Sequence, residues 1–337
     1  MSKRGRIFVA GGAGYIGTHT CVELLNEGYE VVVYDNFSNS SAEALKRVET
    51  ITGKVITLIV GDIRDEGAMR EAMAGCDVVI HFAGLKAVGE SVAKPLDYYD
   101  NNVHGTLCLL RAMDTNNMKT LVFSSSATVY GDPEYLPLNE SHPLRTTNPY
   151  GRTKLVIEEI LRDLYTSDPT WKIMILRYFN PVGAHKSGLI GEDPQGIPNN
   201  LMPFVAQTAV GRREKLRVFG ADYSTHDGTG VRDYIHVVDL AQGHLKALQA
   251  LNTPQCTALN LGTGIGYSVM DVVKAFEKAS ERRVPYTIAP RREGDIAVCY
   301  ADSLFSNSLL GWRASRTLED MCRDTWHFQS KNPNGYL

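Results

Sequence analysis

Short apolar runs rich in Val and Ile alternate with helix-forming stretches through the first half of the chain. Six strands are predicted at 7–10, 30–34, 55–60, 78–82, 121–123 and 172–178, and helices at 18–27, 64–74, 97–116 and 150–165. Continuous apolar strands that alternate with helices indicate a parallel sheet covered on both faces. The pattern therefore predicts an α/β fold built on a doubly wound parallel sheet.

The composition of the sequence changes after residue 180. The segment 183–200 is rich in Gly, Pro, Asp and Asn, which predicts a long ordered loop. Two further strands and a helix between them are predicted at 233–238, 258–261 and 238–251. These later strands could return to the main sheet.

The length of 337 residues fits one large domain or two medium ones. We expect a nucleotide-binding domain at 1–180, with segments of about 230–265 returning to it. The remainder, 181–337, is expected to form a smaller, mixed α/β domain that binds the substrate.

Composition removes several classes of protein. Lys and Arg total 35 and Asp and Glu total 38, a net charge of −3, whereas nucleic-acid binders usually carry a basic excess. No apolar run approaches the roughly 18 residues that span a bilayer. Six cysteines lie apart, at Cys21, Cys76, Cys108, Cys256, Cys299 and Cys322. Without a CxxC pair or a His cluster they predict no metal, and they favour a reducing, cytoplasmic location.

A glycine-rich turn, GGAGYIG at 11–17, lies directly between the first strand and the first helix. Missing Cβ atoms allow a tight turn and let the backbone approach a pyrophosphate at a helix N-terminus. Asp35 follows Gly17 by 18 residues, where the partner of a ribose hydroxyl belongs. An acidic residue there, with no Arg or Lys at 36–40, favours NAD over NADP. The sequence therefore predicts a Rossmann sheet that binds NAD. A second acidic strand end, Asp62, could bind adenine or could simply form a turn.

A tyrosine and a lysine, Tyr150 and Lys154, are four residues apart and would share one helical face. A phenol has a pKa of about 10, too high for a base at neutral pH, but a nearby cation lowers it. The spacing alone is a weak signal, because both residue types are common on helix surfaces. Its context strengthens it, since the preceding strand ends in three serines at 124–126.

This combination resembles the short-chain dehydrogenase/reductase family, in which Ser, Tyr and Lys act together on a carbon that bears oxygen. By that resemblance Ser126 binds the reacting oxygen, while Ser124 and Ser125 cap the strand or touch the cofactor. Over nearly the whole chain the sequence is similar to the UDP-hexose 4-epimerases, extended members of the family. The segments that carry this similarity are 11–17, 35–40, 61–63, 81–91 (HFAGLKAVGES), 98–106, 123–131 (FSSSATVYG), 148–154, 176–183 (LRYFNPVG), 199–203 (NNLMP), 228–236 (GTGVRDYIH) and 291–295 (RREGD).

The resemblance implies reversible C4 epimerisation of UDP-glucose and UDP-galactose through a transient 4-keto intermediate and tightly bound NAD. Tyr150 would be the base, Ser126 would position the reacting oxygen, and Lys154 would bind the nicotinamide ribose and keep Tyr150 acidic. The expected NAD contacts are Gly11, Gly14, Tyr15, Ile16, Gly17, Asp35, Asn36, Ser38, Asn39, Ser40, Asp62, Ile63, Phe82, Ala83, Gly84, Lys86, Asn101, Ser124, Tyr150, Lys154 and Tyr178. Among them, Asn101 is expected to hold the loop over NAD.

The UDP-sugar diphosphate calls for cations, and guanidinium groups can bind phosphate bidentately. The expected substrate contacts are Lys86, Ser126, Tyr150, Asn180, Asn200, Leu201, Arg217, Val218, Phe219, Arg232, Arg292, Asp295 and Cys299. The resemblance places Arg232 and Arg292 on the diphosphate, Asp295 on a ribose hydroxyl and Phe219 on uracil. For Phe219 a buried core position is an equal alternative.

Cys299 stands where the family varies between a bulky tyrosine and a small residue. A small side chain leaves room for an N-acetyl group at C2, which implies use of UDP-GlcNAc and UDP-GalNAc as well. The alternative is that Cys299 only packs and that neighbouring Tyr300 closes the pocket.

Two other functions compete with epimerisation. A nucleotide-sugar dehydratase or decarboxylase is one, although a dehydratase needs an added acid and base, and the stretch 126–128 (SAT) holds no carboxylate. A non-catalytic NAD-binding regulator is the other, although such modules usually lose the Tyr–Lys pair. The family also implies a homodimer formed through the helices at 97–116 and 150–165.

Overall fold

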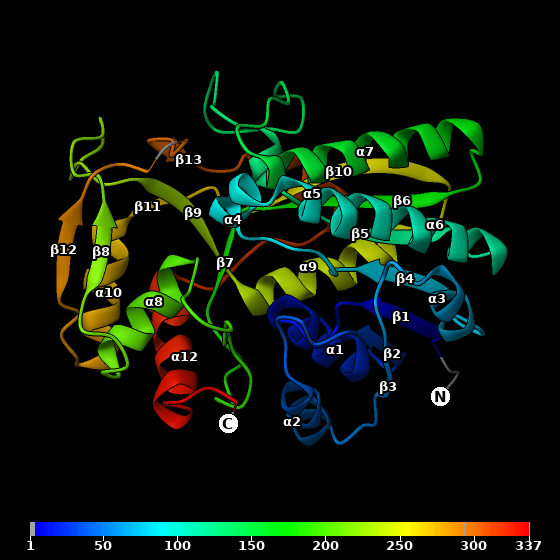
Figure 1. Ribbon diagram of the computed structural model, residues 1–337, viewed down its shortest axis with the longest axis horizontal. Coiled ribbons are helices and arrows are strands. Elements are labelled where there is room, and N and C mark those ends of the chain that lie inside the picture. The colour runs from blue at the N-terminus through cyan, green and yellow to red at the C-terminus, as the bar shows by residue number, and fades with distance from the viewer. Residues whose placement is uncertain (1–3, 293, 337) are drawn as a thin grey trace.

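A seven-stranded parallel sheet forms the larger part of the protein, in a computed structural model that describes residues 4–292 and 294–336 (Figure 1). Its strands are β1 (Arg6–Ala10), β2 (Glu30–Asp35), β3 (Thr57–Val60), β4 (Val78–His81), β5 (Thr120–Ser126), β6 (Lys172–Tyr178) and β10 (Gln255–Leu261). They lie in the order β10-β6-β5-β4-β1-β2-β3, with all pairs parallel. The predicted doubly wound α/β fold is confirmed.

Helices cover both faces of this sheet (Figure 1). One layer holds α1 (Tyr15–Glu27), α2 (Ala42–Thr52) and α9 (Val237–Ala250), and the other holds α3 (Glu66–Ala72), α6 (Gly105–Thr115) and α7 (Pro149–Ser167). Alternate residues of the strands supply the two cores, because successive side chains point to opposite faces, although the edge strand β3 is mostly exposed. In β1, Ile7 and Val9 pack toward the first layer, and Phe8 and Ala10 toward the second.

The helix predicted at 97–116 is divided into three consecutive pieces. These are α5 (Pro95–Tyr98), a π-helical turn (Tyr99–His104) and α6. A π-helical turn holds one extra residue per turn, and such turns are frequent at functional sites. The short helix α4 (Val88–Ala93) precedes these pieces and packs beside α7.

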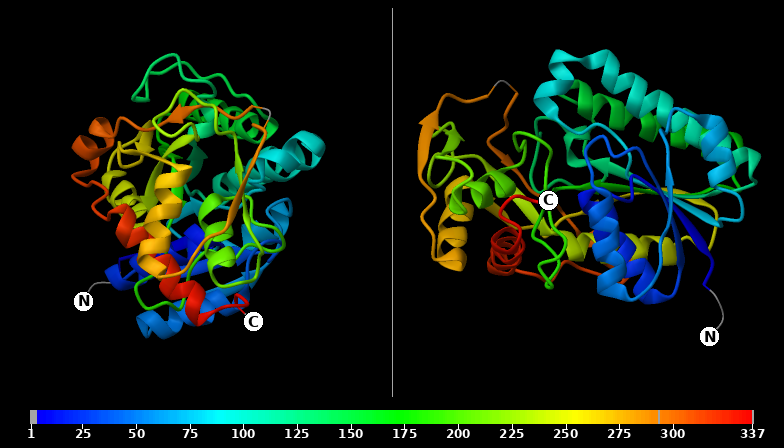
Figure 2. Two further views of the ribbon diagram at one scale, coloured as in Figure 1. Left: turned by 90° about the vertical axis from the view of Figure 1, so that its left-hand side faces the viewer. Right: turned by 60° about the horizontal axis from the view of Figure 1, so that its bottom comes forward.

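The smaller part of the molecule groups beside the main sheet, as Figures 1 and 2 show from three sides. Its strands are β7 (Asn180–Val182), β8 (Leu216–Phe219), β9 (Val231–His236), β11 (Gly266–Ser268), β12 (Tyr286–Ala289) and β13 (Val298–Cys299). Its helices are α8 (Leu201–Ala209), α10 (Val269–Ser280), α11 (Leu304–Leu310) and α12 (Leu318–Lys331). The segment 183–200 carries no helix or strand, in line with the predicted loop.

The later strands divide between the two parts. β10 pairs with β6 at the edge of the main sheet, whereas β9 lies between β11 and β13 in the smaller sheet. The expectation that the strand at 233–238 could return to the main sheet was therefore wrong. Its apolar pattern suits a buried strand of either sheet, so the pattern could not choose between them.

Both parts meet at the carboxyl ends of the main strands. β6 leads within two residues into β7, and β10 leads through a short turn into β11. Ligands of doubly wound sheets bind outside the carboxyl ends of the strands. No helix in the described ranges 4–292 and 294–336 is long and apolar enough to cross a bilayer.

Candidate active site

The residues predicted to bind NAD come together at one edge of the main sheet. The glycine turn follows β1, Asp35 ends β2, Asp62 follows β3, 82–86 follows β4, Ser124 lies near the end of β5 and Tyr178 ends β6. Since these strands are parallel, their carboxyl ends share one edge. The side chain of Ile63 is an exception, because it packs in the hydrophobic core and can offer only backbone atoms.

Gly12 and Gly17 are required by close neighbours, whereas Gly14 has room for a side chain. A Cβ on Gly12 would lie 2.7 Å from Val33, and one on Gly17 would lie 2.5 Å from the carbonyl oxygen of Gly11. A Cβ on Gly14 would meet nothing closer than that oxygen at 3.4 Å. Gly14 also precedes α1 without any side-chain cap, so its face is open and the first N–H groups of the helix are available to an anion.

Asp35 anchors the loop that follows β2. It is buried and accepts hydrogen bonds from Ala13 N at 3.0 Å, Phe37 N at 2.9 Å and Ser40 Oγ at 2.8 Å. A carboxylate has about four acceptor positions, so Asp35 keeps capacity for a ribose hydroxyl. The glycine turn and this carboxylate together fit a bound NAD. Asn39 lies farther along this loop, and its Oδ1 accepts from Gln195 N at 3.4 Å.

Asp62 is strongly committed to protein partners. Arg64 binds its two oxygens at 2.8 and 2.9 Å, and Asn36 Nδ2 donates to it at 3.1 Å. The hydrogen bonds from Arg64, with smaller help from Asn36, hold the pKa of this carboxyl well below its usual range. A contact between Asp62 and adenine would have to use a carboxylate lone pair that Arg64 and Asn36 do not occupy.

The loop after β4 is held by Asn102, which lies on the π-helical turn and is buried. Its amide accepts from Leu85 N at 2.8 Å and donates to Leu85 O at 2.9 Å and to Thr153 Oγ1 at 3.1 Å. Asn101, to which the sequence assigned this task, instead donates to the Asn102 side chain at 2.9 Å. The loop-holding role is thus corrected to Asn102, and an NAD contact from Asn101 stays a prediction.

Tyr150 and Lys154 occupy the first turns of α7, as their spacing predicted. The helix begins at Pro149 with Asn148 as its N-cap, accepting from Gly151 N at 2.8 Å. Lys154 is 5% exposed, and its ammonium donates to the carbonyl oxygen of Ser124 at 2.7 Å. Burial lowers the pKa of Lys154 to about 8, which the charge of Glu158 partly offsets.

The Tyr150 phenol is tuned by Ser126. Burial raises the pKa of Tyr150, and a hydrogen bond from Ser126 opposes that rise. The ammonium of Lys154 donates to Ser124 in this structure, and the expected lowering of the Tyr150 pKa by Lys154 stays a prediction. Ser126 itself accepts from Thr128 N at 3.2 Å and Thr128 Oγ1 at 3.0 Å, so its own proton remains free to donate.

On the substrate side, one carboxylate joins two predicted contacts. Glu192 Oε1 lies 3.5 Å from Lys86 Nζ and accepts from Asn200 Nδ2 at 2.7 Å. Lys86 comes from the loop after β4 and Asn200 from the start of α8. Glu192 therefore links the two parts of the protein where the sequence predicts diphosphate and sugar contacts.

The predicted uridine side lies around Phe219. The guanidinium carbons of Arg217 and Arg292 lie 5.1 and 4.9 Å from its ring centroid. Arg292 binds Asp295 through two hydrogen bonds, of 2.8 and 3.2 Å. Phe219 is therefore a partly exposed ring that cations surround, not a core residue. Glu293 of the same motif lies outside the described residues.

The remaining substrate-side predictions lie at three places. Asn180 and Leu201 begin β7 and α8, at the border between the two parts. The side chain of Val218 is in the core, so only its backbone can face a ligand. Arg232 donates to the carbonyl oxygen of Val231 at 2.8 Å and lies beside Cys299, its register partner in β13.

Cys299 is 8% exposed and packs with Val129 and Phe179, which lie close to the serine end of β5. Tyr300 lies near Gly266, where an added Cβ would be 3.6 Å from its ring. Cys299 therefore packs against protein neighbours. The size of the sugar pocket at Cys299, and its closure by Tyr300, stay predictions.

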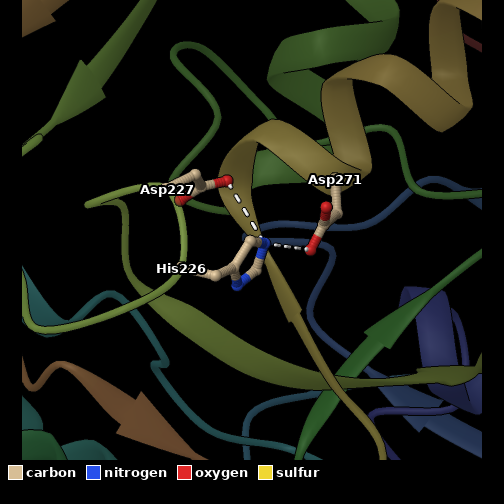
Figure 3. A group of neighbouring side chains, drawn as sticks. All are labelled: His226, Asp227 and Asp271. Carbon is tan, nitrogen blue, oxygen red and sulfur yellow. Dashed lines mark ion pairs between the residues drawn. The ribbon is translucent and has the colours of Figure 1, made fainter.

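One further cluster contains a histidine and two carboxylates, shown in Figure 3. His226 Nε2 lies 3.6 Å from Asp227 and 3.2 Å from Asp271. Asp227 also accepts from Thr229, and Asp271 accepts from Ser268 N at 2.9 Å as part of the capping box of α10. These contacts give both carboxylates a structural task, which is to hold the loop to the start of α10.

Sequence reasoning missed several residues around the site: Asn102, Thr128, Glu158, Glu192 and His244. Asn102 and Thr128 lay in segments that carry the family resemblance, 98–106 and 123–131. The partners of the others are distant in sequence, and no local pattern signals them.

Comparison with known proteins gives consistent matches. The sequence model of the NAD dependent epimerase/dehydratase family matches residues 7–262. A UDP-glucose 4-epimerase of Bacillus subtilis (strain 168) is 63% identical over 333 residues, covering 98% of each chain. That of Homo sapiens is 57% identical over 341 residues, again covering 98% of each. The crystal structure of UDP-glucose 4-epimerase from Bifidobacterium longum in complex with NAD+ and UDP has a TM-score of 0.96 at 57% identity, covering 98% of this chain and 99% of that one.

Proposed function

The chain belongs to the NAD dependent epimerase/dehydratase family, and from this premise we propose that it interconverts UDP-glucose and UDP-galactose by inverting C4. One observation carries the proposal. Ser126, Tyr150 and Lys154 come from β5 and α7 to the edge of the sheet where the glycine turn lies. A phenol, a hydroxyl and an ammonium beside an NAD site suit oxidation and reduction at an alcohol carbon.

The chain's own residues would act as follows. Tyr150 as phenolate removes the proton of the 4-hydroxyl, and Ser126 donates its free proton to the same oxygen. When bound, NAD supplies the hydride acceptor and donor and brings the positive charge of its nicotinamide to the site. Lys154 adds its own charge close by, so the phenolate that burial disfavours in the protein alone is stabilised in the complex.

Inversion requires the sugar to present both faces of C4 while UDP stays bound. Arg232 and Arg292 would hold the diphosphate and Asp295 a ribose hydroxyl. Phe219 would stack on uracil, with its ring already flanked by guanidinium groups. Tight binding of UDP with few contacts to the hexose permits the 4-ketose to turn, after which C4 regains its hydride and Tyr150 returns the proton to the C4 oxygen.

Three finer proposals accompany this function. Cys299 leaves space near the sugar, so UDP-GlcNAc and UDP-GalNAc are also substrates. A homodimer forms through α7 and the helical segment 97–116, near which Leu96 is 80% exposed. All six cysteines are free, which suits the reducing cytoplasm.

The test is conversion of purified UDP-galactose by the purified protein without added NAD, followed by chromatography of the nucleotide sugars. The expected result is the same UDP-glucose to UDP-galactose ratio approached from either side, with Tyr150→Phe retaining NAD but losing about 10²–10⁴ in rate. A protein that carries NAD and leaves both sugars unchanged would be a regulator. A 4-keto-6-deoxy or decarboxylated product would identify the rival enzymes.

A further inference from the structure

His244 is a fully buried histidine that no step of the proposed reaction uses. It lies on α9, beneath the main sheet. Its Nδ1 lies 2.8 Å from the carbonyl oxygen of Leu240, one helical turn earlier. A carbonyl only accepts, so Nδ1 carries the hydrogen and Nε2 presents a lone pair. Burial lowers the pKa of His244 to about 4, so the ring is neutral at physiological pH.

The lone pair of His244 is occupied by the hydroxyl of Tyr178, the last residue of β6. The two rings are 5.1 Å apart between centroids. Because Nε2 can only accept, the direction of this bond is fixed and Tyr178 donates. The two residues are 66 positions apart in sequence. The contact therefore joins a helix of one layer to a strand end of the sheet.

The same imidazole packs against Phe82, with ring centroids 4.9 Å apart. Phe82 directly follows β4, and Tyr178 ends β6, whereas β5 lies between these two strands in the sheet. His244 therefore ties together two strand ends that are not neighbours. Between them, β5 ends at the serines that approach Tyr150 and Lys154.

Ser124 lies between Tyr178 and the catalytic lysine. Burial raises the pKa of Tyr178, and Ser124 beside the phenol opposes that rise. The carbonyl oxygen of Ser124 accepts from Lys154 at 2.7 Å. Hydrogen bonds with one direction thus run from Tyr178 through His244 to Leu240.

We propose that His244 is a positioning residue that fixes the Tyr178 phenol and the Phe82 ring, the two aromatic side chains expected to border the nicotinamide end of NAD. A satisfied core histidine would only contribute stability. Here the acceptor atom, Nε2, lies behind the two side chains that are predicted to border NAD. Loss of this acceptor would free the Tyr178 ring to rotate and would let NAD leave faster. This proposal rests on the proposed function, since that function gives Tyr178 and Phe82 their place beside NAD.

Three variants separate positioning from packing. His244→Phe keeps an aromatic ring but removes the acceptor, and His244→Gln places an amide oxygen near the position of Nε2. Tyr178→Phe removes the donor from the other side. The readout is the release rate of NAD from the purified holoenzyme, measured by exchange with radiolabelled NAD, with the melting temperature recorded for each protein.

We expect about tenfold faster NAD release from His244→Phe and from Tyr178→Phe, the effect of one buried hydrogen bond. The double variant should release NAD no faster than either single one, because both remove the same contact. His244→Gln should stay within about twofold of the parent, since it keeps an acceptor.

Release of NAD from His244→Phe at the wild-type rate would overturn the proposal. A double variant whose release rate rises by the product of the two single effects would overturn it as well. If His244→Phe does not fold, Tyr178→Phe decides alone, and unchanged release then rejects the idea. Failure of the parent protein to hold NAD or to epimerise would reject the proposed function instead, which the parent's own assay reveals.

Discussion

Glu158 and Arg177 form an ion pair with almost no exposed surface, with two hydrogen bonds of 2.7 and 3.0 Å. Glu158 also accepts from Ser125 at 2.6 Å and from Arg162 at 2.8 Å. It lies one turn after Lys154 on α7, and Arg177 lies on β6. The pair therefore fixes the catalytic helix against the strands that end at the site.

Removing the charge of Glu158 should destabilise the folded protein. Glu158→Gln is expected to reduce the free energy of unfolding by about 3–5 kcal/mol, because Arg177 stays buried without its counter-ion. Replacing both by Leu and Met should cost far less. Urea denaturation of both variants, with exposed Glu159→Gln as the control, tests this. A loss below about 1 kcal/mol for Glu158→Gln would show that water or another anion replaces the carboxylate.

The same pair predicts acid sensitivity. Burial alone would raise the pKa of Glu158, but Arg177, with Ser125 and Arg162, holds it below its usual value. A depressed carboxyl pKa contributes stability that is present above the unfolded-state pKa, about 4.3, and is lost as the pH falls through the folded-state pKa. Unfolding free energies measured from pH 7 to pH 3 should fall less in the Glu158→Leu, Arg177→Met double variant than in the parent.

The buried ammonium of Lys154 should destabilise the folded protein, although catalysis requires it. Burial lowers its pKa to about 8, whereas the unfolded chain keeps about 10.4. Below pH 8 the folded state carries a disfavoured charge worth up to about 3 kcal/mol, and stability is regained as the pH rises toward 10.4. After the lost hydrogen bond to Ser124 is subtracted, Lys154→Met should gain about 1–2 kcal/mol at pH 7.

This gain should disappear above pH 10, and epimerisation should be lost at every pH. Denaturant unfolding at pH 7 and pH 10 measures the difference, with exposed Lys46→Met as the matched control. A Lys154→Met protein that is less stable than the parent at pH 7 would mean that the ammonium contributes more through Ser124 than burial costs.

Thr128 should affect turnover through Ser126. Its hydroxyl donates to Ser126 Oγ at 3.0 Å, which leaves the serine proton directed at Tyr150 or the sugar. Thr128→Val is expected to lower kcat about tenfold with KM within about twofold, because one orienting hydrogen bond is lost. Thr128→Ser should restore kcat. Steady-state kinetics decide, and a raised KM with unchanged kcat would make Thr128 a binding residue instead.

Local patterns predicted much of the nucleotide-binding part and less of what surrounds it. Continuous apolar runs between helical stretches predicted the main strands, and the glycine turn with Asp35 predicted the NAD site at the carboxyl ends of these strands. Both signals depend only on residues that are close together along the chain. Asn102 and His244 could not be found this way. Asn102 was hidden by a π-helical turn inside an unbroken helical pattern, and His244 by a partner 66 residues away.

Cys299 should control the size of the sugar. It packs against Val129 and Phe179 with 8% exposure, so a larger side chain must displace its neighbours or fill the sugar side. Cys299→Tyr is expected to reduce kcat/KM for UDP-GalNAc by about tenfold or more while that for UDP-galactose falls only a few-fold. Cys299→Ser should keep both. Equal losses on both sugars would indicate general disruption of the site.

Gly14 and Gly17 should respond differently to the same added methyl group. At Gly17 a Cβ would lie 2.5 Å from the backbone of Gly11, so Gly17→Ala should destabilise the protein by about 2 kcal/mol or more. At Gly14 the backbone has φ −71° and the nearest atom would be 3.4 Å away. The free energy of unfolding of Gly14→Ala should therefore lie within about 0.5 kcal/mol of that of the parent.

The methyl of Gly14→Ala nevertheless stands on the open face of the turn, where a pyrophosphate would approach the start of α1. We expect about tenfold weaker NAD binding from this well-folded variant, measured by NAD release and calorimetric titration. Gly89→Ala, at an open position in α4, is the control and should bind NAD normally. Unchanged binding by Gly14→Ala would place the pyrophosphate elsewhere on the glycine turn, because a ligand in contact with Gly14 cannot share that space with a methyl group.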